Sequence, residues 1–326
     1  MIGKKNSQLS LLDGALSGRK KRSKSDTLLS RMNELIEWGR MASRCETVYK
    51  DSGRGRPSIP ATVMVKCLVL QYMYNLSDPE MEDALIDRLS FQRFVGLDIT
   101  DDIPDFTTIW RFRERLVKDG LLKRLFNDIL AELEKRRLIL RRGTLVDATI
   151  VQAARKKADD EETDSPQRDR DARGTQKGGK PYFGYKGHIG VDEKSNIIRR
   201  MRFTPANVHD SRVLPDLVSG DERAVFGDKA YAAAAVKRDF RARGVYCGIM
   251  DKGRRGRPRL SSGQRKKNTI IATIRNAVER PFAYFKRHLG YRCVRYVTLK
   301  RNEFHFGFLC MIHNIRRLIT LTASSG

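Results

Sequence analysis

The chain has 326 residues, enough for about two domains with a substantial core. Its 65 Lys and Arg against 39 Asp and Glu leave a formal net charge of +26, which predicts a polyanionic partner, most commonly nucleic acid. A hydrophobic fraction of 40% excludes a disordered basic tail, and five scattered cysteines without Cys-x-x-Cys spacing exclude a disulfide framework and a zinc finger.

The sequence carries no segment typical of a membrane span or a secretion signal. Residues 63–74 form the most apolar stretch, but they include Lys66 and Gln71 and are shorter than the ~18 residues that a span requires. Residues 1–24 alternate polar and basic residues without the apolar core of a signal peptide. We therefore expect a soluble protein of a reducing compartment, the cytoplasm.

Residues 25–140 have the apolar spacing of helices and predict an all-α domain over 1–141. Ser77 and Glu80 form a capping box ahead of one apolar stripe, and Asp105 marks the start of a further helix. That helix also carries three arginines, Arg111, Arg113 and Arg115. Two interpretations remain open: the helix reads a DNA groove, or it is a core helix with solvated arginines.

After this helical half the pattern changes. Residues 144–151 form a β-branched run that is typical of a buried strand. Residues 182–191 and 197–203 follow as two strands of a hairpin, because the segment between them has turn chemistry. A second domain is therefore expected over 142–326.

A parallel βαβ unit is predicted downstream of the hairpin. Asp210 is expected to cap a short helix. A strand over 224–226, a helix over 230–243 and a strand over 245–250 then follow. Strand, helix and strand at this spacing imply two parallel neighbours in one sheet.

The rest of the second domain alternates charged segments with helices. Residues 155–180 contain no Val, Ile, Leu, Met or aromatic residue, and the basic stretch 252–267 is rich in Gly, Pro and Ser. We expect both to be mobile loops, because nothing in them offsets the entropy of ordering. The apolar stripe of 270–289 predicts a long helix broken or kinked near Pro281, and a final amphipathic helix covers 304–319.

The positive charge is concentrated in one part of the chain. Residues 251–300 hold fifteen Lys or Arg and only two acids, Asp251 and Glu279. Such polarisation favours a surface that follows a phosphate backbone over an ordinary solvated face. The residues expected to contact DNA are Arg254, Arg255, Arg257, Arg259, Lys266, Lys267, Arg275 and Lys286.

Three acids stand in unusual places. Asp147 lies within an apolar strand, where an unpaired carboxylate is costly to bury. Asp228 lies just past the carboxyl end of a strand, where open α/β sheets place ligands, and Glu279 is the only acid between Lys252 and Glu303. Each alone has an ordinary structural explanation. Together they are the set that Mg²⁺-assisted phosphoryl chemistry requires, and we expect them to converge on one site.

The helix around Glu279 adds a second constraint. Arg275, Glu279 and Lys286 are spaced by four and seven residues, so that on one continuous helix they share a face beside the apolar stripe. That face would present an acid to metal ions and two cations to a DNA backbone.

Ordered motifs link these acids: Thr144–Thr149, Tyr185–Asp192, Thr204–Asp210, Gly227–Tyr231, and Val278–Phe282 followed by Lys286–Arg292. Through them the stretch from about Arg56 to Leu318 resembles the D-D-E transposases of bacterial insertion sequences, and within these the insertion-sequence-five group. The related Tyr-Arg-Glu-Lys signature is met at Arg275, Glu279 and Lys286, with Ala272 at the tyrosine position. The short interval between Asp228 and Glu279 leaves no room for the large inserted domain of some relatives.

The resemblance implies an α/β fold: an RNase H-like catalytic core with a mixed five-stranded sheet flanked by helices, preceded by the all-α domain. In that core Asp147 lies on the first strand, Asp228 follows the fourth, and Glu279 lies on the next helix. Lys186, His188, Asn207 and His209 also lie in family-like motifs. For these four a structural role and a functional one fit the sequence equally well.

The implied function is that of a DNA transposase. It would bind the terminal repeats of its own element through the N-terminal helices, cleave a phosphodiester, and join the freed 3′-hydroxyl to target DNA. Asp147, Asp228 and Glu279 would hold two Mg²⁺ ions, with Mn²⁺ able to replace them, and the partners would be double-stranded DNA and a second copy of the chain, giving a dimer that bridges two ends on the bacterial nucleoid. The alternatives are a catalytically silent DNA-binding descendant and a hydrolytic nuclease of the same fold.

Overall fold

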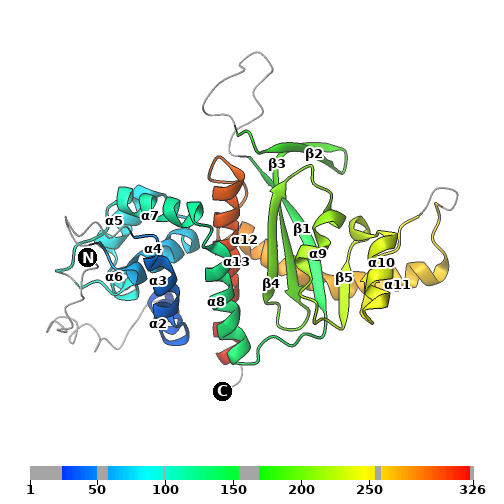
Figure 1. Cartoon of the computed structure of the whole chain (residues 1–326), viewed down its shortest axis with the longest axis horizontal. Coiled ribbons are helices and arrows are strands. Elements are labelled where there is room, and N and C mark those ends of the chain that lie inside the picture. The colour runs from blue at the N-terminus through cyan, green and yellow to red at the C-terminus, as the bar shows by residue number, and fades with distance from the viewer. Residues whose placement is uncertain (1–23, 50–57, 99, 154–168, 254–257, 324–326) are drawn as a thin grey trace, which may run out of the picture. The chain divides into compact units, whose positions relative to one another are not determined.

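The computed structural model describes residues 24–49, 58–98, 100–153, 169–253 and 258–323 (Figure 1). By its contacts the chain divides into two compact units, one through Glu132 together with the residues from Leu318 on, the other from Leu133 to Arg317. The division falls earlier than residue 141, because Arg141 belongs to a polar network of the second unit. None of the described helices combines the length and the apolar character needed to cross a membrane.

The first unit is helical, as the spacing of its apolar residues predicts. The Ser77 hydroxyl accepts from the backbone of Glu80 at 3.3 Å, and the Glu80 carboxylate accepts from the backbone of Ser77 at 2.7 Å. Asp105 accepts from the backbone of Thr108 at 2.7 Å, so both expected helix starts are confirmed. The helices are α2 (Lys24–Leu35), α3 (Trp38–Glu46), α4 (Ala61–Met73), α5 (Asp78–Asp87), α6 (Leu89–Val95), α7 (Phe106–Lys118) and α8 (Leu122–Lys135).

Helix α4 is the centre of this unit. Its sequence is apolar nearly all round, and its side chains are buried on every face. Lys66 is the one charged residue of α4, and its ammonium nitrogen lies 5.5 Å from the ring centroids of both Trp38 and Phe94. The two ring faces give the buried ammonium a favourable electrostatic environment.

The second unit is built on a mixed sheet. Strand β1 (Thr144–Gln152) pairs antiparallel with β3 (Lys180–Asp192), which pairs antiparallel with β4 (Ile198–Pro205). On its other side β1 is parallel to β5 (Ala224–Gly227), and β5 is parallel to β6 (Tyr246–Ile249). The resulting order β4-β3-β1-β5-β6 confirms the expected hairpin, the parallel βαβ unit and the RNase H-like core.

The sheet has six strands rather than five. The additional strand, β2 (Arg173–Lys177), pairs with the start of β3, so the expected loop over 155–180 is wrong from residue 173 on; residues 154–168 lie outside the described residues. Between the two strands, Gly178 and Gly179 have φ of 58° and 76°, the positive values that two-residue hairpin turns require. The Gly-Gly pair was the sequence signal for this hairpin. Strand β2 has no apolar side chains, so its backbone hydrogen bonds to β3 hold it in place.

The basic loop is also shorter than expected. Helix α11 (Ser262–Arg275) begins inside 252–267, because Ser261 and Gln264 form a capping box that composition alone conceals. The expected break near Pro281 lies earlier, at a 3₁₀ turn over Asn276–Val278. Pro281 lies in the first turn of α12 (Glu279–His288), where a missing backbone N–H leaves no intrahelical bond unmade.

Two helices cover opposite faces of the sheet. A Cβ at Gly187 would meet the ring of Phe306 on α13 (Leu299–Ala323), whereas a Cβ at Gly190 would meet the carbonyl of Leu217 on α9 (Asp210–Leu217). Residues an odd number apart on a strand face opposite ways. The α9 face holds a buried apolar cluster of Val146, Leu214, Val225, Tyr231 and Ile249, among others.

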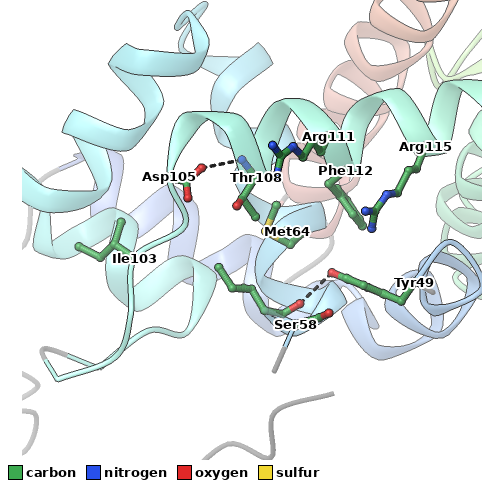
Figure 2. Close-up of a pocket in the computed structure, with 10 residues that line it drawn as sticks. Tyr49, Ser58, Met64, Ile103, Asp105, Thr108, Arg111, Phe112 and Arg115 are labelled. Carbon is green, nitrogen blue, oxygen red and sulfur yellow. Dashed lines mark hydrogen bonds between the residues drawn. The ribbon is translucent and has the colours of Figure 1, made fainter. Parts of the chain in front are cut away.

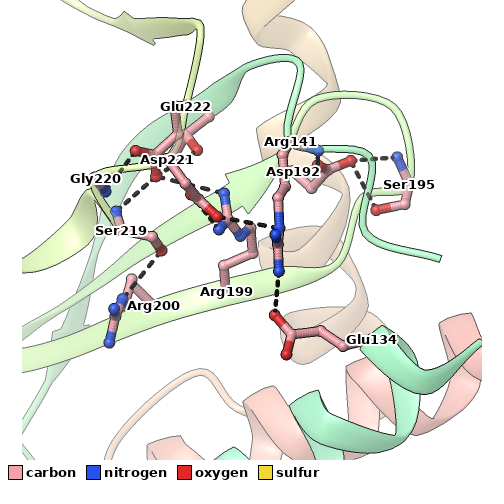
Figure 3. A network of polar contacts seen from close by, with 11 residues as sticks. Glu134, Arg141, Asp192, Ser195, Arg199, Arg200, Ser219, Gly220, Asp221 and Glu222 are labelled. Atoms are coloured by element: carbon pink, nitrogen blue, oxygen red, sulfur yellow. Dashed lines mark hydrogen bonds and ion pairs between the residues drawn. The ribbon is translucent and has the colours of Figure 1, made fainter. Parts of the chain in front are cut away.

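A polar network fixes the base of this sheet (Figure 3). The Glu222 carboxylate accepts from the Thr144 hydroxyl at 3.1 Å and from the backbone of Ser219 at 2.6 Å. Arg199 and Arg141 both pair with Asp221, at 2.5 and 3.1 Å. The start of β1, strand β4 and the loop before β5 are thereby joined, which sets the level at which β1 and β5 run side by side.

Candidate active site

Asp147 projects from the middle of β1 toward the helices that follow the sheet. It pairs in register with Ile189, on the face opposite to Val146, which lies in the α9-side cluster. Its side chain is 19% exposed. Burial raises the pKa of the Asp147 carboxyl, and the charge of Arg275 acts in the opposite direction.

Asp228 lies beside Asp147 because of the parallel ladder. Thr144 pairs with Val225 and Leu145 with Phe226, so continuing this register puts Asp228 level with Asp147. The Asp228 Oδ1 accepts from the backbone N–H of Ala230 at 2.8 Å and caps the short 3₁₀ helix Lys229–Tyr231. The charge of Asp228 contributes to raising the pKa of Asp147, as expected for two neighbouring carboxylates.

Glu279 is the first residue of α12 and is exposed. The 3₁₀ turn before it packs against β1, which places this helix start next to the strand that carries Asp147. Among the residues that the structure describes, no three or more His, Cys, Asp and Glu side chains are grouped to hold one metal ion. The register places Asp228 level with Asp147, and convergence of the three acids on one site stays a prediction.

Arg275 forms an ion pair with Asp147. Its Nη2 lies 3.3 Å from the Asp147 Oδ1, and its side chain is only 16% exposed. The predicted helix face of Arg275, Glu279 and Lys286 is wrong in one respect: α11 ends at Arg275 and α12 begins at Glu279, with the 3₁₀ turn between them. Arg275 therefore faces the acid, while Lys286 is exposed in the last turn of α12.

The other predicted DNA contacts divide into three kinds. Arg254, Arg255 and Arg257 lie outside the described residues. Arg259 and Lys266 are exposed just before and within α11. Lys267 is half-buried, and its ammonium lies 3.5 Å from the Asp251 carboxylate, which also binds Lys237 at 2.6 Å. Lys267 therefore has an ion pair within the protein, and its contact with DNA stays a prediction.

The structure gives structural contacts to three of the four residues that the motifs left open. Lys186 donates to the carbonyl of Val208 at 2.9 Å and to the Asp210 carboxylate at 3.0 Å, which joins β3 to α9. His188 bonds the Thr204 hydroxyl at 2.9 Å across the hairpin. His209, rather than Asp210, caps α9 through its side chain, and Asn207 lies exposed in the turn before it.

Tyr231 is a buried tyrosine near Asp228 in the chain that sequence reasoning did not select. Its ring is 1% exposed, and its hydroxyl is buried without a hydrogen-bond partner in the described part of the chain. Burial, together with the charges of Asp210, Asp147 and Asp228, raises the pKa of this phenol. The signal available was its place in Gly227–Tyr231, three residues after Asp228.

Two known protein families match this chain. Residues 139–315 match the family described as "Transposase DDE domain", and residues 17–115 match the one described as "Transposase domain (DUF772)". Among solved structures, the chain is similar to the piggyBac transposase in a synaptic complex with hairpin DNA, with a TM-score of 0.45 and 10% identity. That similarity covers 92% of this chain and 75% of the other.

Proposed function

The chain belongs to the family of transposases with a DDE catalytic domain, and we propose that it acts on the ends of its own insertion sequence. It would bind the terminal repeats, cleave a phosphodiester there, and join the freed 3′-hydroxyl to target DNA. The first nucleophile is water and the second is the DNA hydroxyl, so no serine, cysteine or histidine nucleophile is required.

The observation that supports this proposal is the parallel register of β1 and β5, which puts Asp228 level with Asp147. We infer that their carboxylates meet at this edge, where α/β sheets bind ligands. A chain of net charge +26 supplies the attraction for a polyanionic substrate. Two neighbouring carboxylates repel each other, and a bound divalent cation would offset that repulsion.

The donor set fits Mg²⁺, which prefers hard oxygen ligands and is bound by one or two carboxylates together with substrate phosphate. Asp147 and Asp228 would hold the metal, with Glu279 joining from the start of α12 and Mn²⁺ able to replace Mg²⁺. Two such ions in one site would supply Lewis-acid stabilisation of the charge that develops at the phosphate. Before the acids can bind them, the Arg275 guanidinium has to move off the Asp147 carboxylate.

The partners follow from the same chemistry. Double-stranded DNA would serve both as element end and as target, and two copies of the chain would bridge two ends. The helical first unit would read the ends, and in a bacterial cell the protein would lie in the cytoplasm on the nucleoid.

A joining assay tests the function. The chain is incubated with Mg²⁺, a labelled duplex taken from the DNA flanking its gene, and a target plasmid. A transposase gives labelled plasmid, a nuclease gives only shortened duplex, and a silent binding protein gives only a mobility shift. Asp228→Asn is the matched control, because it removes the charge and keeps the side chain's size and its acceptor for Ala230.

A further inference from the structure

The first unit contains a cavity of about 380 Å³ beside α7 that the catalytic site does not explain (Figure 2). Its lining comes from α7, from the start of α4 and from the chain on either side of the undescribed residues 50–57. The lining includes Tyr49, Ser58, Thr108, Arg111, Phe112 and Arg115.

One wall of the cavity is rigid. Phe112 is 3% exposed, and its ring centroid lies 5.9 Å from that of Tyr49. The Tyr49 hydroxyl donates to the carbonyl of Ile59 at 2.8 Å, which ties the end of α3 to the start of α4. The shape of the cavity is therefore set by packed aromatic rings before any ligand arrives.

Two arginines, Arg111 and Arg115, lie over this wall. Arg111 and Arg115 are one helical turn apart on α7, both exposed, and neither has an ion pair or side-chain hydrogen bond with the described residues. Arg113, between them in sequence, is 3% exposed and makes a bidentate pair with Asp78 at 2.6 and 2.8 Å. Arg113 thus has a structural role in the first unit, whereas Arg111 and Arg115 are available to bind a ligand.

The remaining polar groups suit an oxyanion. The hydroxyls of Ser58 and Thr108 line the same cavity and can donate. Asp105 is the only acid of the lining, and its carboxylate already accepts from the Thr107 hydroxyl at 2.6 Å and the Thr108 backbone at 2.7 Å. Two guanidiniums and two hydroxyls against one engaged carboxylate leave the cavity net positive.

We propose that this cavity binds a backbone phosphate of double-stranded DNA, held between Arg111 and Arg115. Guanidinium groups bind phosphate oxygens bidentately, and a pair of them one turn apart matches a phosphodiester. The neighbouring face of α7 supports a duplex over a small free anion, because Trp110 is 45% exposed beside Arg111 and extends the contact surface beyond the cavity. The inference rests on the proposed function and deepens it by naming DNA contacts in the first unit.

The test compares two variants of equal charge. Arg111→Gln/Arg115→Gln removes the clamp, and Lys123→Gln/Arg124→Gln removes the same charge from exposed positions of α8. Binding of the full chain to a labelled duplex from the gene's flank is measured by fluorescence anisotropy over a range of salt concentrations, without metal. We expect the clamp variant to bind about tenfold to a hundredfold more weakly and to lose up to about two units of the log-affinity against log-salt slope, because each phosphate contact releases about one counterion.

Two further results complete the test. Both variants should keep the thermal midpoint of the wild type, because the replaced side chains are exposed, and Arg111→Lys/Arg115→Lys should recover the salt slope but only part of the affinity. Equal weakening by the clamp and α8 variants, or no weakening by either, would overturn the inference. If the wild type joins DNA while the clamp variant binds normally, the cavity assignment fails and the function stands; if the wild type neither binds nor joins DNA, the function fails.

Discussion

Arg275 Nη2 lies 3.3 Å from Asp147 Oδ1, with both side chains less than a fifth exposed. This pair joins the end of α11 to the middle of β1 and gives the half-buried carboxylate a counter-charge. The same carboxylate is a proposed metal ligand, so Arg275 and a divalent cation compete for one oxygen.

Replacing Arg275 by glutamine should therefore increase the stabilisation of the protein by metal while leaving the fold intact. Without metal we expect Arg275→Gln to lower the free energy of unfolding by about 1 kcal/mol, since Asp147 then faces Asp228 without a partner. Added Mg²⁺ should raise the thermal midpoint of this variant more than that of the wild type. Arg238→Gln on α10 (Ala234–Ala242), an exposed arginine, is the control. Equal metal responses in all three proteins would mean that Arg275 does not compete with the ion.

Replacing any of the three acids should abolish strand cleavage without weakening DNA binding. Asp147→Asn, Asp228→Asn and Glu279→Gln are each expected to lower the rate of strand cleavage about 10³-fold or more, because each removes a ligand for the ions at the scissile phosphate. Affinity for the duplex should stay within a factor of about three, since phosphate contacts elsewhere set the register. The measurements are single-turnover cleavage and anisotropy on the same preparations. Full cleavage by Glu279→Gln would show that another residue completes the site.

Gly190 should tolerate no side chain. A Cβ there would meet the Leu217 carbonyl, so Gly190→Ala has to push α9 away from the sheet at a cost of about 1–3 kcal/mol. Gly174→Ala on β2 is the matched control, because nothing lies within 4 Å of its Cβ position. Denaturant unfolding of both variants checks the difference. A cost at Gly174 as large as that at Gly190 would contradict the close packing of α9.

His313 should make the second unit less stable in acid. Burial lowers the pKa of this imidazole from 6.5 to about 4. The hydrogen bond to the Asn196 carbonyl acts to raise the pKa, whereas the charges of Arg317 and Arg316 lower it further. The unfolded chain then binds a proton between about pH 6.5 and 4 that the folded chain does not, so the free energy of unfolding falls on acidification by at most about 1.4 kcal/mol per pH unit.

The check on His313 is a comparison of slopes. His313→Gln retains a donor for the Asn196 carbonyl, which accepts from Nε2 at 2.8 Å, and removes the titration. Its unfolding free energy should fall less steeply than that of the wild type over this pH window. Identical slopes would place the acid sensitivity on other groups, such as His188, whose pKa burial also lowers to about 4.

The features that the sequence by itself determined are local: helix starts and the positions of individual strands. The capping residues Ser77 and Asp105 mark helix starts because a side-chain oxygen reaches only the next turn of backbone. The β-branched run predicted strand β1, and the strand-helix-strand spacing predicted that β5 and β6 are parallel neighbours. These local patterns need no knowledge of the rest of the chain, whereas the parallel pairing of β1 with β5 joins residues far apart in sequence.

What only the tertiary structure decided is which distant groups come within reach of one another. Nothing near Lys267 in sequence identifies Asp251 as its ion-pair partner, and nothing near Arg275 identifies Asp147. An ion pair forms between those charges that the packing of α11 on the sheet brings to within about 4 Å. Strand β2 likewise depends on the edge that β3 offers to its backbone. Periodicity and capping act over one turn, whereas the choice of counter-charge is made across the fold.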